Sequence, residues 1–254
     1  MMLKNSFRYK LTLVLLFYFF MIFGYAYFSK SLLINGEVEV YPYAMIRKSS
    51  SSDSYAYKNT TYRDNIVSLT FEDEINIPEE AIASWDVSAN SDSAVMSYVM
   101  ENEADNTKYD LFIQAEGVIV ANYDSSYMFA NLKGLETINN MDFYDTSLVT
   151  NMHEMFYYTG YNAATFNIDL SGWDTSSVTN MSSMFYCAGR QATTWNIGNL
   201  SNWNTSNVTS MSHMFYNVGQ NATTFSLDLS NWNTGNVTSM QSMFSNAGRN
   251  ATTF

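Results

Sequence analysis

The chain has 254 residues, enough for one large or two modest domains, and its 12 Lys and Arg against 24 Asp and Glu give a net charge of −12. This charge argues against nucleic acid as a partner, because nucleic-acid binding uses clustered Lys and Arg to neutralise phosphates. It also argues against electrostatic docking on anionic lipid, since the sequence has no polybasic stretch. An acidic balance of this kind is typical of a solvated surface that keeps an exported protein soluble.

The N-terminus has the pattern of an export signal. Basic residues precede the stretch 11–27 (LTLVLLFYFFMIFGYAY), which carries no charge. That stretch is just long enough to cross a bilayer if it stays uncleaved, while Gly24-Tyr25-Ala26 has the small-x-small pattern of a cleavage site. We therefore expect residues 1–27 to be a signal peptide or a membrane helix. The rest of the protein would then be extracellular, on the cell surface, either anchored through residues 11–27 or secreted after cleavage.

Two segments follow before the repeats begin. Residues 28–60 predict a short hairpin around Asn35-Gly36 and then a serine-rich spacer. Residues 61–127 are non-repetitive and β-rich, with a further hairpin expected over 109–122. Three single strands are expected in this block, over 66–71, 84–88 and 94–100. Because the first unit of a repeat array would expose its apolar face, we expect residues 61–127 to cap the array.

Residues 128–254 form tandem repeats. WDTSSVTNMSSMF (173–185) returns as WNTSNVTSMSHMF (203–215) and WNTGNVTSMQSMF (232–244), and a first copy, YDTSLVTNMHEMF, begins at Tyr144. Successive copies begin 29 or 30 residues apart, at positions 144, 173, 203 and 232. A fixed period of this length is typical of a solenoid, in which each unit buries its apolar face only against its neighbours.

Within one unit the apolar spacing changes from that of a strand to that of a helix. In residues 165–170, apolar side chains alternate with polar ones, which predicts a strand with one buried face. A set with helical spacing follows, with Thr179 as the expected N-cap and Gly189 at the expected C-terminus. Its members are Val178, Met181, Met184, Phe185 and Ala188. The expected fold class is therefore an α+β repeat solenoid, leucine-rich-repeat-like, with one short strand and one short helix per ~29-residue unit, an N-terminal β-rich cap and an N-terminal membrane or signal helix.

The sulfur-containing and aromatic residues of the repeats are expected to form the core. Many of the methionines recur in the two slots of the M-x-x-M-F motif, and Met is a flexible filler of irregular apolar space. Trp173, Trp203 and Trp232 occupy another slot, for which packing is the favoured role and a binding stripe is the alternative. Cys187 is the only cysteine, so an intrachain disulfide is excluded and a small core side chain is expected.

We expect no enzymatic activity, because no catalytic, cofactor-binding or metal-binding motif occurs in the sequence. The two histidines, His153 and His213, fall in non-equivalent slots between paired methionines. A calcium site at the slot of Asp145 and Asp174 is disfavoured, because later copies carry asparagine there. No catalytic, metal or cofactor-binding residue is therefore assigned, and no cofactor is expected.

The tandem motif W-[DN]-T-[SG]-x-V-T-x-M-x-x-M-F resembles the repeat of BspA-type leucine-rich-repeat bacterial surface proteins. The preceding segments 84–88, 94–99 and 109–129 resemble the part of such proteins that comes before the repeats. The resemblance covers residues 60–254 and implies an extracellular solenoid that acts in adhesion or surface recognition. The units here are longer than the commoner form of about 25 residues, through an added stretch such as Gly219–Phe225.

The expected function is that of an exported, surface-displayed, non-catalytic recognition or adhesion module whose partner is an extracellular protein or glycan. The alternative is a structural cell-surface or matrix component that self-associates; an enzyme with its site in residues 61–127 has no supporting motif. Residues 250–254 end where another strand should begin, which predicts a longer protein or an open face that self-associates. The side chains expected to face a partner are Asn207, Ser212, His213, His153 and Ser183.

Overall fold

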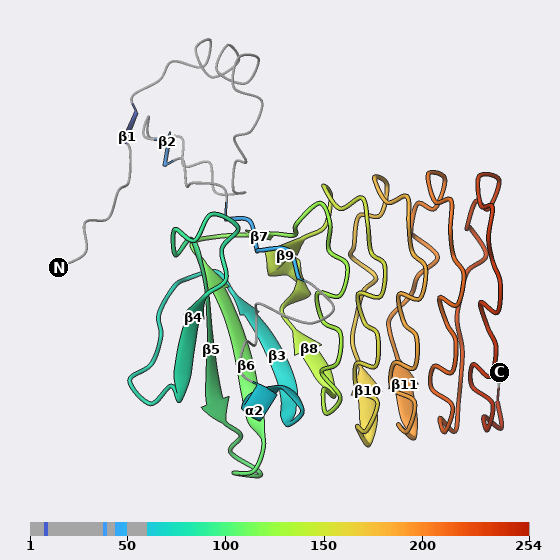
Figure 1. Ribbon diagram of the computed structural model, residues 1–254, viewed down its shortest axis with the longest axis horizontal. Coiled ribbons are helices and arrows are strands. Elements are labelled where there is room, and N and C mark those ends of the chain that lie inside the picture. Colours follow the sequence, from blue (N-terminus) through green and yellow to red (C-terminus); the bar gives the residue numbers. More distant parts are fainter. Residues whose placement is uncertain (1–7, 10–37, 40–43, 50–59, 254) are drawn as a thin grey trace.

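The computed structural model describes residues 8–9, 38–39, 44–49 and 60–253 (Figure 1). Its main element is a seven-stranded mixed sheet in the order β11-β10-β8-β3-β6-β5-β4. These strands are β3 (Ile66–Glu72), β4 (Ala83–Asp86), β5 (Val95–Glu101), β6 (Tyr109–Ala115), β8 (Thr137–Asn139), β10 (Thr165–Asn167) and β11 (Thr194–Asn196). Two short pairs complete the sheets: β1 (Arg8–Tyr9) with β2 (Val38–Glu39), antiparallel, and β7 (Ile119–Val120) with β9 (Tyr144–Asp145), parallel.

The strands of the block before the repeats follow the sequence pattern closely. The three single strands predicted there are confirmed as β3, β4 and β5. The hairpin predicted over 109–122 is wrong: β6 pairs with β3 and β5, whereas β7 leaves the sheet. The chain turns at Gly117 (φ 85°), and the Val120 amide then donates to the carbonyl oxygen of Ala44 at 2.8 Å. β7 therefore bonds to segments distant in sequence and not to the adjacent strand β6.

From residue 123 onward the chain forms a stack of similar coils, one per repeat, which lie side by side from β8 to the C-terminal end in Figure 1. We call residues 123–253 the repeat stack. Parallel bridges join equivalent positions in successive coils: Asp124 to Asn151, Asn151 to Asn180, Asn180 to Ser210, and Ser210 to Ser239. The coil from 173 to 202 is one residue longer because Gly198-Asn199 stands where its neighbours have a single aspartate. Gly198 takes a φ of 81°, and the extra residue lies outside the bridged positions.

The interior of the stack consists of side-chain ladders. Phe129, Phe156, Phe185 and Phe215 stack with ring centroids 5.1 to 5.5 Å apart. The indoles of Trp173 and Trp203 are nearly parallel, at 6.4 Å, and the Trp203 Nε1–H donates to the carbonyl oxygen of Leu170 at 3.0 Å. Core packing is thus confirmed for Trp173 and Trp203, for most of the repeat methionines and for Cys187, while Trp232 is half-buried against the core.

The predicted fold class is wrong, because the segment with helical spacing is not a helix. Ser183 and Cys187 have φ values of 55° and 58°, in the left-handed region that a right-handed helix excludes. Alternate amides donate to the next coil instead: that of Ser183 to the Ser212 carbonyl at 2.8 Å, for example. The Thr179 hydroxyl likewise donates to the Thr150 carbonyl of the preceding coil and caps no helix. The described residues are mostly β structure and turns, with only the four-residue α2 (Thr60–Arg63) and the 3₁₀ helix η2 (Met141–Phe143) as helices.

Among the described residues no helix has the length and apolar character needed to span a membrane. The signal or membrane helix predicted over residues 11–27 lies outside the described residues, as do residues 50–59 of the serine-rich spacer predicted over 45–60 and most of the hairpin around Asn35-Gly36. The described start of that spacer packs against the block: Met45 bridges Val120, Ile46 bridges Ser88, and the Ile46 side chain is buried.

Candidate functional site

One surface of the repeat stack carries a row of tyrosines that the sequence analysis did not single out. Tyr157, Tyr186 and Tyr216 occupy equivalent positions, and their rings stack at 5.1 and 4.7 Å. Tyr158 packs against Tyr157 at 4.6 Å and stacks on Tyr161 at 5.1 Å. We call these five residues the tyrosine ladder. Each is half-buried, so ring faces cover one another while part of each ring reaches solvent.

The local backbone explains this placement. Each tyrosine of the equivalent set follows the phenylalanine of the M-F pair, whose side chain is fully buried. The Phe185 amide donates to the next coil at 2.9 Å, while the Tyr186 amide closes a turn on the Ser183 carbonyl at 3.0 Å. Met184 and Phe185 are buried inside the coil, whereas Tyr186 is half-buried and lies on its outer surface.

Three of the five tyrosines of the ladder have a raised pKa, which favours the neutral hydroxyl. Burial raises the pKa values of Tyr157, Tyr158 and Tyr186 above the ordinary value for tyrosine. The carboxylate of Glu154 adds to the effect at Tyr157, and the thiol of Cys187 adds to it at Tyr158 and Tyr186. The ladder therefore presents phenolic O–H groups, which both donate and accept hydrogen bonds, next to aromatic ring edges.

Both histidines lie on this surface. The His153 ring meets Tyr127 edge-on at 5.5 Å, and its Nδ1 lies 2.8 Å from the Ser182 hydroxyl. The His213 ring lies beside the stacked pair Tyr186 and Tyr216, with centroid distances of 6.5 and 5.8 Å. His213 thus contacts the tyrosine ladder, whereas the His153 ring packs against Tyr127, which is not part of that ladder.

The other side chains predicted to face a partner are divided between two places. Ser183 and His213 are equivalent residues of adjacent coils, with φ values of 55° and 57°, and Ser212 precedes His213; all three are half-buried on the tyrosine surface. Asn207 is exposed but lies apart, and its side-chain amide donates to the Ser176 carbonyl at 2.7 Å. That hydrogen bond ties Asn207 to the preceding coil.

A guanidinium group borders the tyrosine ladder. The Arg190 Nη1 donates to the Tyr161 hydroxyl at 2.8 Å, and its Cζ lies 5.5 Å from the centroid of the same ring. Its Nε donates to the Gln220 side-chain oxygen at 2.7 Å. A cation is therefore fixed at the edge of the aromatic surface by contacts with two neighbouring coils.

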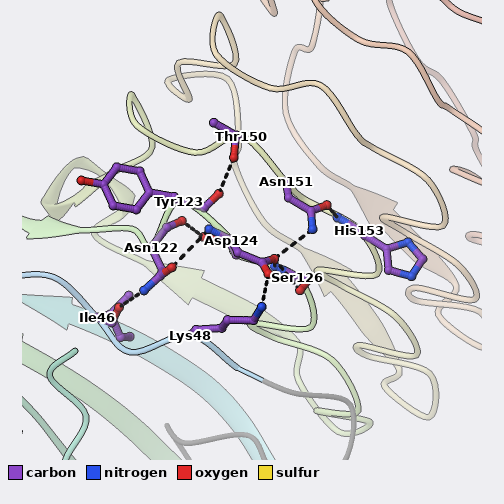
Figure 2. Close-up of polar contacts among 10 residues, drawn as sticks. Ile46, Lys48, Asn122, Tyr123, Asp124, Ser126, Thr150, Asn151 and His153 are labelled. Carbon is purple, nitrogen blue, oxygen red and sulfur yellow. Dashed lines mark hydrogen bonds and ion pairs between the residues drawn. The ribbon is translucent and has the colours of Figure 1, made fainter. Parts of the chain in front are cut away.

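The first coil of the stack is anchored through Asp124 (Figure 2). Its carboxylate forms an ion pair with Lys48 and accepts hydrogen bonds from the Ser126 hydroxyl at 2.6 Å and the Asn151 amide at 2.9 Å. Burial alone would raise the pKa of Asp124, but these partners outweigh it and hold the pKa below its usual range. The Asn151 side chain in turn accepts from the His153 amide at 3.0 Å. The anchor thus positions the coil that carries the first histidine.

This surface combines hydrogen-bonding and aromatic groups. Phenols, imidazoles and a guanidinium offer donors, acceptors and aromatic edges in a repeated arrangement. The described residues contain no group of three or more His, Cys, Asp or Glu side chains that could hold a metal ion. A sequence signal for the ladder existed: the M-F pair is followed by tyrosine in three successive units, at 157, 186 and 216.

The repeat stack matches a known protein family. Residues 123–253, just over half of the chain, match the family described as Mycoplasma protein of unknown function, DUF285. The chain belongs to the DUF285 family. This family is related to BspA-like repeat proteins, so the resemblance predicted from the sequence is confirmed at that broader level. The DUF285 match begins at Tyr123, one residue before the first bridged position, Asp124. No curated protein and no solved structure matches the chain.

Proposed function

We propose that this protein is a non-catalytic recognition module of the cell surface, which binds an extracellular ligand through the tyrosine ladder. The observation that carries the proposal is the stacking of Tyr157, Tyr186 and Tyr216 on an outer surface, with His213 beside two of them. Tyrosine supplies a large, rigid contact area and a polar tip at a low cost in conformational entropy. Because the same groups recur from coil to coil, a long ligand can engage several of them at once and gain affinity from multivalency.

The surface location and the adhesive role rest on two further observations. The uncharged stretch 11–27 behind basic residues is typical of exported proteins. The DUF285 family is related to BspA-like repeat proteins, and the adhesive role is the one that the resemblance to the BspA-type leucine-rich-repeat members implies.

A binding assay with a matched substitution tests this proposal. Serine occupies the slot of Tyr216 in the next coil, at Ser245, so the backbone of that slot accepts serine. A full-length triple variant, Tyr157→Ser with Tyr186→Ser and Tyr216→Ser, should bind host cells and immobilised matrix proteins and glycans at least about tenfold more weakly. The control is Tyr123→Ser, because the Tyr123 side chain is exposed outside the ladder. Unchanged binding by the folded triple variant would contradict the proposal.

A further inference from the structure

The basic side chains of the repeat stack all fall in one row. Backbone hydrogen bonds set the register: the amide of Asn162 donates to the carbonyl of Lys133 at 2.9 Å, and that of Gln191 to Tyr161 at 3.2 Å. The same bond joins Asn221 to Arg190 and Asn250 to Gln220 in the later coils. Equivalent positions in the five successive coils, which we call the basic row, are therefore Lys133, Tyr161, Arg190, Gln220 and Arg249.

This row stands out against the charge of its surroundings. Lys133, Arg190 and Arg249 are all the basic residues between 123 and 253. The acidic residues of the same segment occupy other slots: Asp124, Glu136, Asp142, Asp145, Glu154, Asp169, Asp174 and Asp228. A row that holds every cation of an otherwise acidic stack is complementary to an anionic ligand.

The cations also alternate with neutral residues. Lys133, Arg190 and Arg249 are separated by the coils that carry Tyr161 and Gln220. Because hydrogen-bonded strands lie about 4.8 Å apart, cations in every second coil are roughly 10 Å apart along the stack. This spacing is comparable with the length of one disaccharide in an extended chain. Polysaccharides that alternate a uronic acid with a neutral sugar carry one carboxylate in each such unit.

The neighbours of the basic row suit a sugar chain better than other polyanions. An exposed row of side-chain amides adjoins it, in which the Asn250 Nδ2 donates to the Asn221 side-chain oxygen at 2.9 Å. The tyrosine ladder adjoins it through the hydrogen bond from Arg190 to Tyr161. Amides and phenols match the hydroxyl and acetamido groups of sugars. The net charge of −12 meanwhile repels densely charged polyanions at long range, which favours a ligand of low charge density.

We propose that the basic row binds an acidic polysaccharide of alternating uronate and neutral sugar residues, which lies along the axis of the stack. Arg190 and Arg249 pair with carboxylates of successive disaccharides, and the flanking amides and tyrosines bind the neutral sugars. This inference rests on the proposed recognition function and names its ligand class.

The test uses the full-length protein and three probes in calorimetry: hyaluronan oligosaccharides, the same oligosaccharides with their carboxylates reduced to alcohols, and poly-L-glutamate. Hyaluronan should bind at least about tenfold more tightly than either of the other probes. Arg190→Gln and Arg249→Gln should each weaken hyaluronan binding about threefold to tenfold. Lys108→Gln, a cation of the β5–β6 connection, is the control and should change nothing.

A second variant keeps the test decisive. Arg249 is exposed, so Arg249→Gln remains informative if Arg190→Gln disturbs the contacts with Tyr161 and Gln220.

The remaining outcomes separate this inference from the proposed function. Equal binding of carboxylate-reduced oligosaccharides, preference for poly-L-glutamate, or no binding of hyaluronan would each overturn the polysaccharide assignment. If hyaluronan does not bind but the tyrosine triple variant still loses cell binding, the recognition function stands and only its ligand class is wrong. If neither assay detects binding, both proposals fail.

Discussion

The block from 60 to 122 and the repeat stack use hydrogen bonds in different ways. In the block, each side-chain bond joins an unrelated pair, such as Ser68 to Asp110 at 2.5 Å and Gln114 to Glu72 at 2.6 Å. In the stack one bond recurs: Thr179, Thr209 and Thr238 each donate their hydroxyl to the carbonyl of the threonine one coil earlier. A substitution in the block thus disturbs one local set, whereas a substitution in the stack disturbs two identical interfaces. The same substitution can therefore be compared in a buried coil at the centre of the stack and in the more exposed last described coil.

The largest expected effect comes from breaking the phenylalanine ladder at its centre. Phe185 is fully buried and stacks on Phe156 and Phe215 at 5.3 and 5.5 Å. Phe185→Ala should lower the free energy of unfolding by about 3–5 kcal/mol through lost burial and a cavity. Phe244→Ala is the matched change in a half-exposed copy and should cost about 1 kcal/mol or less. Urea unfolding measures both; equal losses would show that the coils do not depend on having a neighbour on each side.

A smaller effect is expected from a glycine series that separates crowding from backbone strain. A Cβ on Gly189 (φ 56°) would lie 2.6 Å from the Trp195 ring and 2.8 Å from Phe166, so Gly189→Ala should cost about 2–4 kcal/mol. Gly117 in the block has a φ of 85° and open space around it, so Gly117→Ala should cost only about 1–2 kcal/mol of backbone strain. Gly172→Ala meets neither problem and should lie within about 0.5 kcal/mol of the parent. Any other order in urea unfolding would contradict this separation.

Alkaline pH should weaken both regions through buried phenols. The pKa values of Tyr157, Tyr158 and Tyr186 are raised in the stack, and burial with the nearby Glu72 raises the pKa of Tyr98 in the block to about 12. Above pH ~10, tyrosines of the unfolded chain lose protons that the folded chain keeps, so stability is constant below that pH and falls above it, by up to about 1.4 kcal/mol per pH unit for each tyrosine. Chemical unfolding at pH 8 to 11 measures the slope. The triple tyrosine-to-serine variant should have a shallower slope, and an unchanged slope would contradict this origin.

The smallest effect concerns the anchor between the two regions. The depressed pKa of Asp124 stabilises the fold above pH ~4, and this contribution is lost as the pH falls through the folded-state pKa. Because Lys48 and Asp124 are partly exposed, Asp124→Asn should cost about 1 kcal/mol or less at neutral pH. The variant should also reduce the loss of stability between pH 5 and pH 3. Glu116→Gln, at an exposed position, is the control, and an equal change in that variant would show that Asp124 has no special role.

The sequence predicted the burial of the repeats better than their backbone. The inward positions of Met181, Met184 and Phe185 were correct, because a helix and the observed turns bury the same spacing. What distinguishes the two is the left-handed conformation of Ser183 and Cys187, which requires no glycine and therefore leaves no mark in the sequence. Hydrogen bonds to neighbouring coils, available only after stacking, compensate for that conformation.

The candidate site was predicted only in part. His153, Ser183, Ser212 and His213 were placed on an outer surface by their position between core residues, and they lie there. The tyrosines were missed because their slot is taken by serine in the last copy, and because aromatic residues in an apolar pattern are expected to be core. In the row of cations, the repeated stretch that follows Gly189 and Gly248 already aligns Arg190 with Arg249 in the sequence. Lys133 lies outside that pattern, and only the hydrogen bond from the Asn162 amide to its carbonyl places it in the row.

The extra residue at Gly198-Asn199 shows where the repeat unit accepts a change in length. The residues on either side of the insertion, Ile197 and Leu200, are buried, as are their equivalents Ile168 and Leu170 in the preceding, shorter coil. The Leu170 amide still donates to the Ile197 carbonyl at 3.1 Å. The corner between the strand and the tryptophan is therefore a natural point for insertion, whereas the M-x-x-M-F segment, bonded to both neighbours, admits none. In evolutionary terms, whole units can be duplicated or lost by recombination while this corner diversifies, and a foreign peptide could be grafted there without disturbing the ladders.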